Sequence, residues 1–197
     1  MNVLYINACV RENSRTNELA QYFLQKLGGE FTQVMPHTLS LPTFDRQFYA
    51  QREADCANND FSRQIYSHAK QFREAEMIVV AAPYWDLSFP AELKQYFEHI
   101  NVRGLTFDYS PQGMPVSLCK AQELIYITTA GGEISSEQYG YGYINAFVQT
   151  FFGVQRSTLF KAECLDIYGA DTQEILKRTK REIDTYFIKR SDLIGQA

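Results

Sequence analysis

Residues 8–17 combine side chains that bind anions, at Arg11, Ser14, Arg15, Thr16 and Asn17. At the start of a helix, free N–H groups, the helix dipole and guanidinium groups all favour a phosphate. The glycine patterns of dinucleotide sites and of P-loops are absent from this segment, so a terminal monophosphate is the better match. The alternative is that these hydroxyls and amides only cap a helix, while the arginines are surface charges.

Two further segments contain residues suited to a planar ligand. Residues 83–90 include Tyr84 and Trp85, the only tryptophan of the chain, which suggest a stacking surface. Packing of these rings under the following helix is the alternative. Residues 128–132 end in two glycines, which allow a ligand to approach the backbone closely. The tyrosines at 139, 141 and 143, which alternate with glycine, form either a wall over a ligand or a tight turn.

Apolar runs that alternate with helical patterns must position these segments. The expected strands are Val3–Asn7, Phe31–Met35, Met77–Ala82, Glu123–Thr129 and Thr158–Tyr168. Five strands, each followed by a helical segment, predict an α/β fold with a doubly wound parallel sheet and helices on both faces. Ligands bind such sheets at the carboxyl ends of the strands, where the strand order reverses. The three segments should therefore meet in one pocket, shaped for a planar ring with a terminal phosphate such as FMN.

The intervening segments are less regular. Residues 40–59 are polar and predict an excursion over the surface, and residues 105–113 predict a short hairpin or ordered loop. Ser88 is expected to cap the helix that follows it, with Pro90 in the first turn. Neither internal repeats nor a linker interrupt the sequence, so we expect a single domain over residues 1–197.

Composition narrows the classes of partner. A net charge of −4 argues against nucleic acid as the main partner, because binding to phosphate backbones relies on clustered Lys and Arg. No apolar run approaches the length needed to span a bilayer, and no signal peptide is visible. The four cysteines are widely spaced without a nearby histidine in ligand register, which predicts reduced thiols in a cytoplasmic protein and no metal site.

The three segments also carry a family resemblance. Residues 82–97 (APYWDLSFPAELKQYF), 104–109 (GLTFDY) and 127–132 (ITTAGG) resemble, in order and spacing, the FMN-dependent NAD(P)H:quinone oxidoreductases and azoreductases of the flavodoxin-like superfamily. The resemblance implies a flavodoxin-like fold, FMN as cofactor and NADH or NADPH as hydride donor. It also implies a quinone or azo compound as acceptor, and a homodimer whose interface closes the flavin pocket.

The resemblance assigns roles residue by residue. It places the FMN phosphate on residues at the start of the first helix: Arg11, Ser14, Arg15, Thr16 and Asn17. It places the ribityl chain and the isoalloxazine ring on two loops: Pro83, Tyr84, Trp85, Asp86 and Leu87, and then Thr129, Ala130, Gly131 and Gly132. No side chain need donate a proton, and Tyr139 or Tyr141 is expected to hydrogen bond the acceptor.

Three positions depart from the family pattern. Asp86 stands where the family usually has Asn, Ala8 where Ser is common, and Ala130 where Arg is often found. An ionised Asp only accepts hydrogen bonds, whereas Asn also donates. Two other functions therefore stay open: an electron-transfer flavodoxin, and a relative that has lost FMN and acts as a scaffold or sensor.

Overall fold

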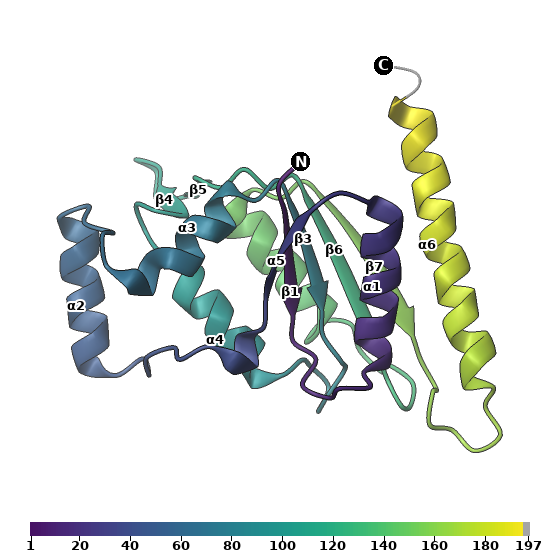
Figure 1. Ribbon diagram of the computed structural model, residues 1–197. Helices are drawn as coiled ribbons and strands as arrows, with labels where there is room; N and C mark the ends of the chain where they lie inside the picture. The colour runs from purple at the N-terminus through teal and green to yellow at the C-terminus, as the bar shows by residue number, and fades with distance from the viewer. Residues whose placement is uncertain (195–197) are drawn as a thin grey trace.

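The computed structural model describes residues 1–194, so the last three residues of the predicted domain lie outside the described range. Its elements, shown in Figure 1 with η denoting a 3-10 helix, are β1 (Val3–Asn7), α1 (Arg15–Leu27), β2 (Phe31–Val34), η1 (Pro36–Thr38), α2 (Arg46–Ala57), η2 (Gln64–Tyr66), α3 (Ser67–Glu74), β3 (Met77–Ala81), α4 (Ala91–Ile100), β4 (Phe107–Tyr109), β5 (Pro115–Ser117), β6 (Glu123–Thr129), α5 (Tyr141–Phe152), β7 (Arg156–Ala162) and α6 (Thr172–Ile194). Within this range, none of the helices is both long enough and apolar enough to cross a bilayer.

The main sheet has five parallel strands in the order β2-β1-β3-β6-β7, which confirms the predicted doubly wound sheet. The chain runs outward from β1 to β2, then returns past β1 to β3 and continues to β6 and β7. The strand order therefore reverses between β1 and β3. In open α/β sheets, the crevice beyond the carboxyl ends at this reversal is where ligands bind.

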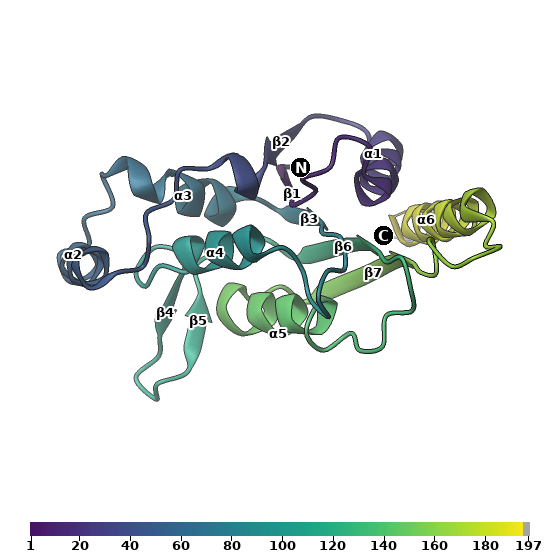
Figure 2. The same ribbon diagram turned by 90° about the horizontal axis from the view of Figure 1, so that it is seen from below.

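Helices cover both faces of the sheet (Figure 2). Helices α1 and α6 lie together on one face, and α3, α4 and α5 lie on the other. A hydrophobic core lies on each face of the sheet, and successive side chains of β3 point into one or the other. Ile78 and Val80 pack in one core, and Met77 and Val79 pack in the other. Each fully buried side chain of this size stabilises the fold by about 1.5–3 kcal/mol, so β3 fixes the position of the loop that follows it.

The segment predicted as a polar excursion over the surface is largely exposed, and residues 46–57 form helix α2, which was not predicted. The buried residues of α2 are Arg52 and Asp55, and it has no apolar stripe. Arg52 donates to the carbonyls of Glu98 and Asn101, and Asp55 accepts a 2.7 Å hydrogen bond from the Tyr66 hydroxyl. Because polar contacts hold this helix, apolar periodicity could not reveal it.

The fifth strand ends earlier than predicted. It stops at Ala162, and Cys164 follows with φ of +61°, which turns the chain back along the loop after β6. There, the N–H groups of Cys164 and Asp166 donate to the carbonyls of Gly132 and Gly131, each at 2.9 Å. Residues 163–171 therefore belong to the loops at the carboxyl edge of the sheet.

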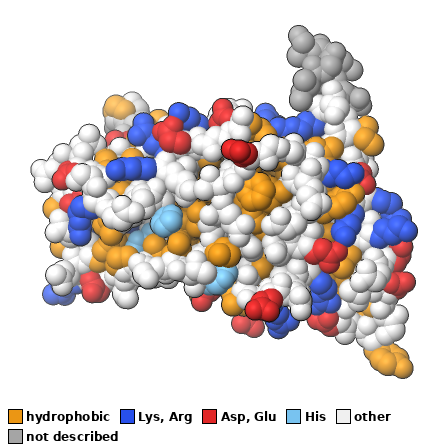
Figure 3. Space-filling view, in the orientation of Figure 1, with side chains coloured by type: hydrophobic (Ala, Val, Ile, Leu, Met, Phe, Trp, Pro, Cys, Tyr) orange, Lys and Arg blue, Asp and Glu red, His pale blue; other side chains and the backbone are white. Residues whose placement is uncertain are grey.

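The predicted hairpin is present. Strands β4 and β5 pair antiparallel and form a second, two-stranded sheet beside α5. On the face of the molecule seen in Figure 3, acidic and basic side chains are interspersed.

Candidate functional site

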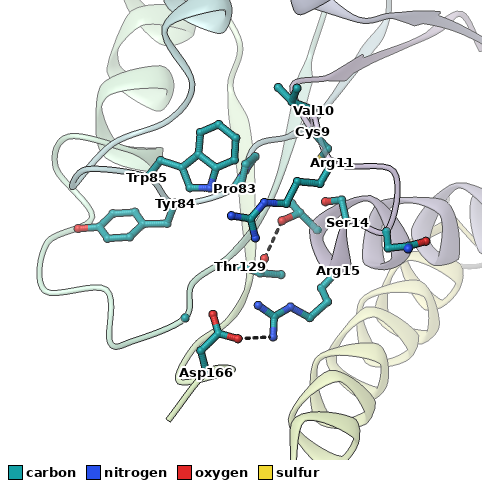
Figure 4. A pocket seen from close by; sticks show the side chains of 13 residues that line it. Cys9, Val10, Arg11, Ser14, Arg15, Pro83, Tyr84, Trp85, Thr129 and Asp166 are labelled. Atoms are coloured by element: carbon teal, nitrogen blue, oxygen red, sulfur yellow. Dashed lines mark hydrogen bonds and ion pairs between the residues drawn. The ribbon is translucent and has the colours of Figure 1, made fainter.

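A cavity of about 220 Å³ opens at the carboxyl ends of β1, β3 and β6. Figure 4 shows its wall, which consists of the three segments selected from the sequence and one residue that follows β7. The lining residues are Cys9, Val10, Arg11, Asn13, Ser14, Arg15, Thr16, Pro83, Tyr84, Trp85, Thr129, Gly131 and Asp166. The cavity thus lies where the strand order reverses, as the fold predicts for a ligand site.

The start of α1 forms one side of the cavity. Ser14 is the N-cap residue, and its hydroxyl accepts a 3.2 Å hydrogen bond from the N–H of Asn17. The N–H groups of Arg15 and Thr16 belong to the first turn of α1 and have no acceptor within the helix. The positive end of the α1 dipole therefore faces the cavity and favours an anion there.

Two arginines add positive charge to the same space. The guanidinium groups of Arg11 and Arg15 point into it in Figure 4. The Arg11 guanidinium carbon lies 6.0 Å from the centre of the Trp85 ring, so this cation stands between the anion site and the aromatic wall. Cation, dipole and free N–H groups together make this end of the cavity suited to a phosphate.

Arg15 also contacts an acidic side chain. Its Nη1 atom lies 2.9 Å from Oδ1 of Asp166 and donates to the carbonyl of Leu165 at 3.2 Å. The hydrogen bond from Arg15 lowers the pKa of the Asp166 carboxyl below its ordinary value, so Asp166 is ionised near neutral pH. Within residues 1–194, the remaining nitrogens of Arg15 make no hydrogen bond to protein and stay available to a ligand.

The second loop contains a tight turn. Trp85 and Ser88 exchange backbone hydrogen bonds of 3.1 and 2.8 Å, and the two residues between them have positive φ, +50° at Asp86 and +68° at Leu87. Two central residues of positive φ are typical of a type I′ turn, which favours Asn, Asp or Gly and disfavours Leu. Such strained backbone beside a cavity is often functional.

Ser88 does not cap α4, contrary to the prediction. Its backbone closes the tight turn, and its hydroxyl donates to the carbonyl of Tyr139 at 2.5 Å. Helix α4 begins at Ala91, with Pro90 at the N-cap position and no side-chain cap.

The third loop joins the other two. The hydroxyls of Thr16 and Thr129 are 2.6 Å apart, and the N–H of Tyr84 donates to the carbonyl of Thr129 at 3.0 Å. At Gly131, a Cβ atom would lie 2.5 Å from Oδ2 of Asp166, so a side chain at this position would require the carboxylate to move from its place beside Arg15. Close approach, rather than positive φ, is the reason for glycine at this position.

Most of the predicted binding residues meet in the cavity wall, and five do not. Those outside the wall are Asn17, Asp86, Leu87, Ala130 and Gly132. The Asn17 side chain instead accepts hydrogen bonds from the Tyr5 hydroxyl at 2.7 Å and from the Asn7 amide at 3.3 Å. Ala130 is buried, and its N–H donates to the carbonyl of Ala162. Asn17 and Ala130 therefore support the loops.

The two predicted acceptor-binding tyrosines lie apart. The side chain of Tyr139 is 57% exposed, whereas the Tyr141 hydroxyl lies 2.8 Å from the Ser157 hydroxyl of β7. Tyr141 lines a separate small cavity together with Tyr84. Of the two, Tyr139 is the more exposed, and its hydroxyl has no partner among the hydrogen bonds of the described residues.

Sequence reasoning missed four wall residues. Cys9, Val10 and Asn13 belong to the predicted first loop, and burial raises the pKa of the Cys9 thiol to about 11. Asp166 was missed because the predicted fifth strand, Thr158–Tyr168, included it, whereas β7 ends at Ala162. The rule that loops after every parallel strand share one edge could have pointed to it. In the described range 1–194, His, Cys, Asp and Glu side chains form no group of three that could hold a metal ion.

Comparison with known proteins identifies the family. The family model described as flavodoxin-like fold matches residues 1–187. The chain is 33% identical over 187 residues to the FMN-dependent NADH:quinone oxidoreductase of Clostridium beijerinckii, which covers 89% of this chain and 92% of that protein. This chain belongs to the flavodoxin-like family. The family resemblance predicted from the three loops is thereby confirmed.

Two further comparisons support this assignment to the flavodoxin-like family. The FMN-dependent NADH:quinone oxidoreductase of Coprothermobacter proteolyticus is 30% identical over 193 residues, or 92% of this chain and 96% of that protein. Among solved structures, the FMN-dependent NADH-azoreductase from Bacillus anthracis str. Ames Ancestor in complex with FMN superposes with a TM-score of 0.78. It is 20% identical and covers 94% of this chain and 96% of that chain, so it supports the fold alone.

Proposed function

We propose that this protein is an FMN-dependent oxidoreductase that passes hydride from NADH or NADPH through FMN to a quinone or an azo compound. The observation that carries the proposal is the convergence of Arg11, Arg15 and the start of α1 with Trp85 in one cavity at the strand reversal. Full-length relatives named FMN-dependent NADH:quinone oxidoreductases support it.

The donor set of the cavity fits FMN. The Ser14 hydroxyl, the Arg11 and Arg15 guanidiniums and the N–H groups at the start of α1 provide hydrogen bonds and positive charge for a phosphate. Thr16 is less available, because its hydroxyl is buried and paired with Thr129. Its N–H group remains for the anion.

Aromatic and backbone groups fit the rest of the cofactor. Pro83, Tyr84 and Trp85 offer apolar surface to a planar ring, and the Asp86–Leu87 turn offers backbone groups beside it. Gly131 has no side chain that would separate its backbone from a ligand. Asn17, Ala130 and Gly132 contribute by supporting the loops rather than by lining the cavity.

When bound, FMN supplies the redox chemistry, because its ring accepts hydride from a reduced nicotinamide and releases it to an acceptor. The protein holds the phosphate at one end and orients the ring at the other. Tyr139 is the candidate for hydrogen bonding the acceptor, since the Tyr141 hydroxyl is already paired with Ser157.

The visible spectrum of the purified protein tests the proposal. We expect flavin absorption, or its appearance after addition of FMN, and rapid anaerobic bleaching by NADH or NADPH followed by reoxidation with a quinone. An electron-transfer flavodoxin would bind FMN without rapid bleaching. A scaffold that has lost the cofactor would stay colourless, and either result contradicts the proposal.

We also propose that the protein is a homodimer. A groove of about 550 Å³ runs between α2 and the β4–β5 hairpin, and its aromatic lining residues are Phe44, Tyr49, Phe107, Tyr109 and Phe147. The hairpin further exposes Met114 and Val116. Exposed apolar and aromatic side chains, here Tyr49, Tyr109, Met114 and Val116, support a protein partner for this part of the surface. Phe152, by contrast, is fully buried in the core and does not belong to this surface.

Sedimentation equilibrium tests the homodimer. We expect twice the chain mass for the wild type and a shift toward monomer for Val116→Lys, which places a charge on the exposed side of β5. A monomeric wild type at micromolar concentration contradicts this proposal. We propose that the protein works in the cytoplasm, supported by its four unpaired cysteines.

A further inference from the structure

An acidic side chain shares the cavity with the two arginines. Oδ1 of Asp166 lies 2.9 Å from Nη1 of Arg15, and its Oδ2 faces the backbone of Gly131. In Figure 4 the carboxylate of Asp166 borders the same open space as the Arg11 guanidinium. The carboxylate thus stands at the cationic end of the cavity, where the flavin phosphate is proposed to bind.

The backbone at Asp166 is held, but its side chain is free to turn. The N–H groups of Asp166 and Leu165 donate to the carbonyls of Gly131 and Ala130 at 2.9 and 3.2 Å. The Asp166 side chain, in contrast, is 64% exposed, and Arg15 is its ion-pair partner. The carboxylate can therefore leave Arg15 for water without any movement of the loop.

We propose that Asp166 competes with the flavin phosphate for Arg15 and thereby sets how strongly the site prefers FMN over unphosphorylated riboflavin. This inference rests on the proposed function, since it concerns the same cavity. It makes Asp166 a specificity-determining residue whose effect is to weaken the binding of the phosphorylated ligand.

Two opposing effects decide whether Asp166 strengthens or weakens the binding of FMN. It helps to hold Arg15 in place, and it repels an anion in the same cavity. The first effect is small, because an exposed ion pair stabilises its geometry weakly and because the Leu165 carbonyl also holds Nη1. The second is larger, because a phosphate monoester carries a charge of about −1.5 to −2 near pH 7. Repulsion therefore dominates.

Asp166→Asn separates the two effects. Asn keeps a carbonyl oxygen that can accept the hydrogen bond from Arg15, but it removes the negative charge. In titrations of the flavin-free proteins followed by quenching of flavin fluorescence, we expect the Kd for FMN to fall about five-fold in this variant. The Kd for riboflavin, which lacks the phosphate, should stay within about two-fold.

Three further variants complete the test. Glu133→Gln removes one negative charge from the neighbouring loop, from an exposed side chain, and should leave both Kd values unchanged. Asp166→Ala should tighten FMN binding as Asp166→Asn does. In an Arg15→Ala background, FMN binds more weakly, and Asp166→Asn should then have a reduced effect, because the shared partner is gone.

The outcomes are distinct. FMN binding that is unchanged or weaker in both Asp166 variants shows that Asp166 only positions Arg15, and it overturns the competition while the proposed function stands. Equal tightening of FMN and riboflavin also overturns it, because the effect would then not act through the phosphate. A wild-type protein that takes up no FMN overturns both proposals.

Discussion

The hydroxyls of Thr16 and Thr129 lie 2.6 Å apart and join the first turn of α1 to the end of β6. Thr16 is only 1% exposed, so water does not replace a partner that is lost there. The contact connects two walls of the candidate cavity across 113 positions of the chain.

Thr16→Val should destabilise the protein by about 1.5 kcal/mol, because it leaves the Thr129 hydroxyl without its partner. The double variant Thr16→Val, Thr129→Val should lose less free energy of unfolding than the two single variants together, since neither hydroxyl is then left unpaired. Urea unfolding of the wild type, the two single variants and the double variant measures this coupling. Strictly additive effects would show that the hydroxyls do not interact.

Leu87→Gly should stabilise the protein by about 1 kcal/mol, because glycine adopts the observed φ of +68° without the penalty that a side chain meets. Leu87 is 53% exposed, so little packing is lost. For a chain of this length, the melting temperature should rise by about 2–4 °C. Ile167→Gly is the control, an exposed aliphatic residue in a loop without positive φ, and it should lower the melting temperature.

The stability of the α2 region should depend on acid pH through Asp55. Burial raises the pKa of this carboxyl, but hydrogen bonds from Tyr66, Gln51 and Arg63 outweigh burial and lower the pKa overall. A group with a lower pKa in the folded state stabilises the protein above its unfolded pKa of about 4, and this contribution is lost as pH falls through the folded value.

Asp55→Asn should therefore cost about 2 kcal/mol at pH 7, and the difference from the wild type should shrink below about pH 4. Unfolding by urea at several pH values measures both. A difference that stays constant from pH 7 to pH 3 would rule out this role for the Asp55 charge.

The two tyrosines should respond differently to loss of the hydroxyl. Tyr141→Phe removes a hydrogen bond to Ser157 and should lower stability by about 1 kcal/mol without changing the KM for a quinone. Tyr139→Phe should raise that KM and leave stability unchanged, because its exposed side chain is free to contact an acceptor. Steady-state kinetics and thermal melts of both variants distinguish the roles, and a KM effect confined to Tyr141→Phe would reverse the assignment.

Much of the sheet could be predicted because its central strands, β1, β3 and β6, are buried on both faces and read as largely apolar runs. Val3–Asn7 and Glu123–Thr129 have the predicted bounds, and Met77–Ala82 is one residue too long. The same argument fails for α2, which presents Arg52 and Asp55 to its neighbours. A helix that is held by polar contacts shows no apolar residues at helical spacing in its sequence.

The site was predictable as far as it follows from strand ends. Arg11, Ser14 and Trp85 could be selected because their loops leave strands at the reversal. Asp166 was missed because polar residues that interrupt the apolar run from 158 to 168 resemble an edge strand and conceal the turn at Cys164. Nor does residue type reveal that the Asn17 side chain faces Tyr5 rather than the cavity.

The cavity draws its wall from the loops that follow β1, β3 and β6 and from Asp166, and these parts are far apart along the chain. Every one of the central strands must therefore be paired before the wall exists, and such long-range pairing is slow relative to local helix formation. Ligand uptake during refolding would consequently report the last stage of assembly. The acidic partner of Arg15 comes from the loop after β7, so this contact forms only once the last strand has joined the sheet.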